Sequence, residues 1–139
     1  MVVKVVYGRR MVWGESVTEH EHAAGLVAYD AALEEGIRAL YPDARISVQS
    51  EGHDSAARVT VDGEDVSETS RVERVLDDAF AVGCSAIGRL NDRVYALRDE
   101  AVMAGDVAQV ALCDAALRGD DAAYARCIDA LEDADGVTS

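Results

Sequence analysis

Lysine and aromatic side chains are both scarce in this chain of 139 residues. Lys4 is the single lysine among thirteen basic residues, and the aromatic residues are one Trp, one Phe and five Tyr. Aliphatic side chains must therefore supply most of a core, for which a chain that is 50% hydrophobic is long enough. No apolar run approaches the ~20 residues that cross a bilayer, and the apolar start is too short for a secretory signal. These absences predict a cytoplasmic protein.

Motifs for catalysis and for metal binding are also missing. The three cysteines have no CxxC spacing, which argues against a zinc finger and against a secreted disulfide framework. There is no GxGxxG, GxxxxGKS/T or GxSxG motif, and the glycine-flanked segment 83–88 lacks the phosphate-binding lysine. The sequence therefore predicts a protein that is not an enzyme, has no catalytic residues and binds no cofactor.

Acidic residues are what the chain has in excess. Twenty-seven acids against thirteen bases give a net charge of −14, beyond the magnitude of about 2–8 that keeps a small domain soluble. Residues 99–139 hold ten of these acids and only two bases. Such a surface repels nucleic acid and anionic membranes and attracts basic proteins. A GC-rich genome or a salt-adapted organism would produce the same acidity without any partner.

The first part of the chain mixes strands and helices. Residues 2–7 and 10–13 favour a β-hairpin. A long helix over residues 17–40 follows, with a capping box formed by Ser16 and Glu19. One apolar stripe runs along this helix at spacings of three or four residues: Leu26, Tyr29, Leu33, Ile37 and Leu40.

A second hairpin and a second helix follow. Residues 45–49 and 58–61 alternate in polarity and predict two paired strands. Ser70 with Glu73 predicts a helix start, and Gly83 predicts its end. The order ββαββα indicates an α+β fold, with an antiparallel sheet of about four strands and helices on one face.

The rest of the chain predicts helices only. Apolar residues repeat at three and four from residue 87 to residue 101, and glycines at 105 and 119 separate two further helices. On these helices the predicted inner residues are Val107, Val110, Cys113, Leu117, Tyr124, Cys127, Ile128 and Leu131. We therefore expect two domains, an α+β domain over residues 1–83 and a helical hairpin or small bundle over residues 84–139.

Part of the helical segment resembles a known type of module. The stretches LRDEAVMAGD (97–106), VALCDAALRGD (110–120) and ARC (125–127) are similar to a helical module of small uncharacterised proteins from bacteriophages and plasmids. This resemblance implies an origin in a mobile element. It implies no catalytic or ligand-binding residue.

The stretch Glu19-His20-Glu21-His22 contains good metal-ligand types. On a helix, however, residues two apart lie about 200° apart and cannot share an ion. His53 lies in a predicted turn and comes close only through folding. We therefore interpret the stretch as a helix start whose acids interact favourably with the helix dipole, and predict no metal site.

Cys113 and Cys127 are equally far from the predicted break at residue 120. Antiparallel helices would place them opposite each other, as two buried thiols or as a redox-linked disulfide.

Charge and resemblance together predict a small interaction protein that inhibits or sequesters a basic, nucleic-acid-binding host protein. Duplex DNA carries a charge about every 1.7 Å of its axis, so an acidic helical face can imitate it, as DNA mimics among the anti-CRISPR proteins do. We expect no direct binding to nucleic acid or membrane. The expected partner-binding residues are Asp114, Asp120, Asp121, Asp129 and Asp133.

Two other functions stay open. One is an accessory subunit or a homodimer whose helical segment pairs with itself. The other is a metal-binding or enzymatic domain centred on His20, His22 and His53.

Overall fold

The computed structural model describes residues 1–8, 18–51 and 57–138. The chain divides into two compact units. The sheet unit contains the described residues of 1–15 and 24–86, and the helical unit contains those of 16–23 and 87–139. The predicted α+β class is confirmed, with one four-stranded sheet and helices.

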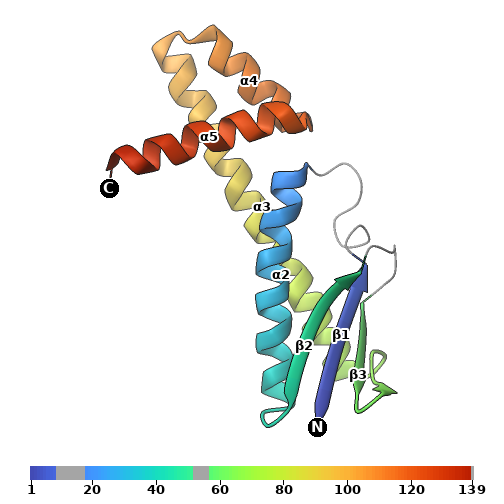
Figure 1. Ribbon diagram of the computed structural model, residues 1–139. Helices are drawn as coiled ribbons and strands as arrows, with labels where there is room; N and C mark the ends of the chain where they lie inside the picture. The colour runs from blue at the N-terminus through green and yellow to red at the C-terminus, as the bar shows by residue number, and fades with distance from the viewer. Residues whose placement is uncertain (9–17, 52–56, 139) are drawn as a thin grey trace. The chain divides into compact units, whose positions relative to one another are not determined.

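The sheet of the sheet unit is mixed, not purely antiparallel. Its strand order is β2-β1-β3-β4, with β1 in the interior (Figure 1). The strands are β1 (Val2–Gly8), β2 (Arg45–Glu51), β3 (Arg58–Val61) and β4 (Glu64–Asp65). Helix α2 (Glu19–Leu40) joins β1 to β2, and such a crossover lets the two strands run parallel.

The predicted hairpin of residues 45–49 with residues 58–61 is wrong. β1 lies between these two strands and pairs with β2 in parallel and with β3 antiparallel. Alternating polarity identifies a strand but not its neighbour, because neighbours are chosen by the packing of the whole sheet. The predicted strand at 10–13 and the predicted cap at Ser16 lie outside the described residues.

A short hairpin joins β3 to β4 through Asp62 and Gly63. Both residues have positive φ, 50° and 87°, as a two-residue type I′ turn requires. An Asp-Gly pair is a favoured sequence for such a turn.

The core of the sheet unit lies between one face of the sheet and two helices. Val3, Val5 and Tyr7 alternate along β1 and are at most 1% exposed. They pack with buried residues of α2 and of α3 (Ser70–Ala104): Tyr29, Leu33, Ile37, Val72 and Ala79. The predicted stripe on α2 is confirmed at its buried positions, and each such aliphatic side chain contributes about 1.5–3 kcal/mol by leaving water.

Helix α3 does not end at Gly83, as the glycine pattern predicts, but continues through it to Ala104. A glycine inside a helix costs only about 1 kcal/mol relative to alanine. Buried residues on both sides of it, Ala79 in the sheet unit and Val94 in the helical unit, offset that cost.

The helical unit is built from the second half of α3, from α4 (Val107–Leu117) and from α5 (Asp121–Thr138). Gly105 and Gly119 separate these helices with positive φ of 72° and 101°. This unit has a core of its own, made of Val94, Cys113, Ala116, Ala123, Tyr124 and Cys127. In the described residues, no helix is both long enough and apolar enough to cross a membrane.

Candidate protein-binding surface

Three of the five acids expected to bind a partner are engaged within the helical unit. Asp114 pairs with the Arg98 guanidinium, each side chain being about one-third exposed. The Asp120 carboxylate accepts a hydrogen bond from the backbone N–H of Ala123 and so caps the start of α5. The Asp121 carboxylate accepts one from the backbone N–H of Glu19 at the start of α2. Asp120 and Asp121 therefore stabilise the starts of α5 and α2, and Asp114 links α4 to α3.

Asp129 and Asp133 lie one turn apart on α5 and are both exposed. Like charges at this spacing destabilise a helix by a few tenths of a kcal/mol. The structure thus separates the five acids into three with a structural contact and two that face solvent.

The start of α2 is a capping box, but it is formed two residues later than the sequence pattern predicts. The Thr18 hydroxyl accepts from the Glu21 backbone N–H, and the Glu21 carboxylate accepts from the Thr18 backbone N–H at 3.1 Å. Thr18 is 2% exposed. One oxygen of Glu21 is therefore committed to capping.

The other oxygen of Glu21 belongs to a side-chain network inside the helical unit. It accepts from the Asn91 amide at 3.0 Å, and the Asn91 oxygen accepts from the Tyr124 hydroxyl at 2.7 Å. Burial, and then the nearby charge of Glu21, raise the pKa of Tyr124. The His20 ring stacks on that of Tyr124, with 6.1 Å between centroids. The network ties α2, α3 and α5 together.

The histidines do not assemble a metal site in the part of the chain that the structure describes. His22 is buried, with 7% of its surface exposed, whereas His20 stacks on Tyr124. His53 lies outside the described residues. No group of three or more His, Cys, Asp or Glu side chains suited to a metal ion occurs among those described.

The two cysteines of the helical unit do face each other, as their spacing predicts. The Cys113 and Cys127 Sγ atoms are 3.8 Å apart, and both residues are fully buried free thiols. Burial, with a further contribution from Cys113, raises the pKa of the Cys127 thiol to about 12. The thiolate form of Cys127 is therefore scarce at neutral pH.

Exposed apolar side chains gather where α3 meets α4. Val102 is 53% exposed, Met103 89% and Val107 79%. Val107 was expected on the inner stripe of its helix, and that expectation is wrong. A hollow of about 250 Å³ lies at the same place, lined by Ala101, Val102, Gly105, Asp106, Val107 and Val110. We call residues 101–110 the α3–α4 corner.

Acids border the α3–α4 corner. Asp99 and Glu100 are exposed in the preceding turn of α3, and exposed Asp106 accepts from the Gln109 backbone N–H as the N-cap of α4. An apolar centre with a charged rim is the usual anatomy of a protein interface. One sequence signal pointed to the corner: Val102 and Met103 are apolar but fall outside the buried seam that contains Val94 and Ala101.

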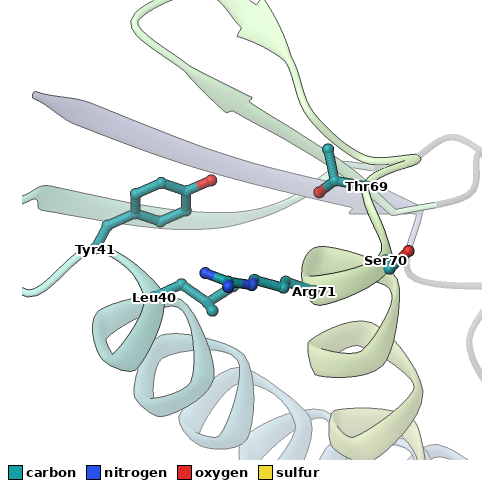
Figure 2. A pocket seen from close by; sticks show the side chains of 5 residues that line it. All are labelled: Leu40, Tyr41, Thr69, Ser70 and Arg71. Carbon is teal, nitrogen blue, oxygen red and sulfur yellow. The ribbon is translucent and has the colours of Figure 1, made fainter.

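A second hollow, of about 380 Å³, lies in the sheet unit (Figure 2). Leu40 and Tyr41 line it from the end of α2, and Thr69, Ser70 and Arg71 from the start of α3. The Thr69 hydroxyl already donates to the Val66 carbonyl at 2.8 Å. The single charged group in its lining is the exposed Arg71 guanidinium, so we do not regard it as the candidate site.

Comparisons of this chain with protein-family models, with curated proteins and with solved structures found no match.

Proposed function

We propose that this chain is a protein-binding module whose helical unit engages a basic partner. The observation that carries the proposal is the α3–α4 corner, where Met103 and Val107 are largely exposed beside acidic residues. Apolar side chains this exposed gain free energy when a partner covers them, about 25 cal/mol for each Å² removed from water.

The acidic rim and the exposed acids of α5 favour a partner segment that is basic and amphipathic. Residues 99–139 carry ten acids and two bases, so a positively charged protein is attracted before contact. A host protein with a nucleic-acid-binding groove has this chemistry. Inhibition of such a protein, as by a DNA mimic of phage or plasmid origin, is the function we propose.

A matched pair of valines tests the α3–α4 corner. Val107 and Val27 are 79% and 72% exposed, and Val27 lies on α2 in the sheet unit. Val107→Asp adds a charge in the first turn of α4, where the helix dipole favours an acid, so the fold should tolerate it. Tagged parent and variant proteins are used to capture partners from a lysate of the source organism, and the captured proteins are quantified by mass spectrometry.

We expect Val107→Asp to reduce capture of the specific partner at least about tenfold, as for a buried interface anchor. Val27→Asp should capture as much as the parent. Equal capture by both variants would show that the α3–α4 corner is not part of the interface.

Two further experiments test the role of the charge and whether the chain binds the partner's nucleic-acid groove. Changing both Asp129 and Asp133 to Asn should slow association and flatten its dependence on salt. Added duplex DNA should displace the chain from a partner's nucleic-acid groove and leave it bound to any other surface. Binding that is indifferent to salt, to DNA and to the α5 charges would contradict the proposed inhibitor function.

A further inference from the structure

Strand β2 is an edge of the sheet in the described part of the chain. It pairs with β1 along all seven of its residues, and no other strand of the described residues pairs with it on its other side. The opposite edge is β4, which is only two residues long. Short edge strands are protected against pairing with another chain, whereas long ones are not.

The backbone of β2 presents a regular row of groups to that edge. The Arg45 N–H bonds to the Met1 carbonyl, so Arg45 directs its backbone groups toward β1. In a parallel ladder, alternate residues direct their backbone N–H and C=O groups toward the neighbouring strand. The backbone groups of the residues between them point to the opposite side. Ile46, Val48 and Ser50 therefore direct both N–H and C=O outward.

Nothing in the residues of β2 blocks a second strand. Its sequence RISVQSE contains no proline and no lysine, the two residue types that most often guard an edge. Its seven residues pair in continuous register with β1, so no bulge twists the edge away. Ile46 and Val48 are only half-buried against the core.

We propose that β2 pairs with β2 of a second copy of this chain, antiparallel, about a two-fold axis at Val48. This register pairs Val48 with Val48 and Ile46 with Ser50, so every bonded pair consists of outward-directed residues. It also places Ser47 opposite Gln49 on both sides of the axis. The strand is thus complementary to itself, and the two sheets become one.

The half-buried apolar side chains contribute most of the stabilisation in this arrangement. Cross-strand neighbours have Cβ atoms about 4.5–5.5 Å apart, so the two Val48 side chains contact each other across the axis. A two-fold interface also closes on itself and stops at a dimer. This inference is independent of the proposed partner-binding surface, which lies in the helical unit.

The test changes Ser47 and Gln49, which face away from the core. The all-acidic variant combines Ser47→Glu with Gln49→Glu, and the all-basic variant combines Ser47→Lys with Gln49→Lys. The mixed-charge variant, Ser47→Glu with Gln49→Lys, replaces the same positions but pairs opposite charges across the axis. Sedimentation measures the mass against the 14.8 kDa of one chain, and circular dichroism checks that each variant is folded.

We expect a dimer for the parent and for the mixed-charge variant. Two like-charged cross-strand pairs should weaken the dimers of the all-acidic and all-basic variants by about tenfold. An equimolar mixture of those two variants should form a heterodimer. Salt should strengthen the parent dimer, because each copy carries −14, whereas salt weakens binding to a basic partner.

Either of two results would overturn the proposal. One is a parent that stays monomeric up to its solubility limit. The other is an all-acidic variant that dimerises as tightly as the mixed-charge variant, because association would then use another surface or another register.

Discussion

Replacing Gly36 by alanine should destabilise the sheet unit, although the same change usually stabilises a helix. Gly36 lies in α2 where Val75 of α3 comes close. A Cβ atom built on Gly36 would be 2.6 Å from one Val75 methyl and 3.2 Å from the other. Real Cβ atoms essentially never come within 3.0 Å of another heavy atom, so something must shift.

Two opposing contributions set the magnitude. Alanine is better than glycine inside a helix by about 1 kcal/mol. Overpacking costs about 1–3 kcal/mol, and its upper part applies here because a β-branched valine has one strongly preferred rotamer in a helix. The net expectation is that Gly36→Ala lowers the free energy of unfolding by about 1–2 kcal/mol.

Urea unfolding of four proteins measures this: the parent, Gly36→Ala, Val75→Ala and the double variant. In the Val75→Ala background the two close methyl groups are gone, so Gly36→Ala should stabilise by up to about 1 kcal/mol. The sign of the effect should therefore reverse between the two backgrounds. A stabilising Gly36→Ala in the parent, or an equal effect in both backgrounds, would refute the close approach of these helices.

Further measurements address the helical unit and the response to alkali. Asn91→Ala removes both the donor to Glu21 and the acceptor of the Tyr124 hydroxyl, so it should lower the free energy of unfolding by about 1–3 kcal/mol. Tyr124→Phe removes one of these hydrogen bonds and should lower it by less. Equal losses for the two variants in urea unfolding would contradict the network. Burial raises the pKa of Cys127 from 9.0 and of Tyr29 from 10.0, each to about 12. Because both pKa values are raised on folding, their contribution to stability is complete below pH 9 and is lost as the pH rises toward 12. The melting temperature should fall over that window, and less so for Cys127→Ala between pH 9 and pH 10; a flat melting temperature would contradict the burial.

The local elements could be predicted from sequence because their signals are local. Tyr29, Leu33 and Ile37 recur at helical spacing, and all three are buried on α2. The alternation at Val3 and Val5 likewise predicts a strand with one buried face. The predicted helix break at residue 120 lies midway between Cys113 and Cys127, and this was sufficient to predict that their thiols face each other. A turn between two helices is also a local feature.

Strand neighbours and helix ends were decided by tertiary structure. The same alternation in β2 and β3 suits a hairpin as well as the observed arrangement with β1 between them, and only the crossover through α2 selects the latter. By propensity Gly83 favours a helix end, but packing on both sides keeps it inside α3.

For the candidate surface too, some features follow from the sequence and others depend on tertiary packing. The charge of −14 and its concentration in the last third of the chain follow from the residues alone. The sequence could not tell that Asp121 accepts a hydrogen bond from the distant Glu19 backbone while Asp129 stays exposed, nor that Val107 lies outside the core. Charge and periodicity are properties of the chain, whereas the exposure of a side chain depends on which distant segments pack against it.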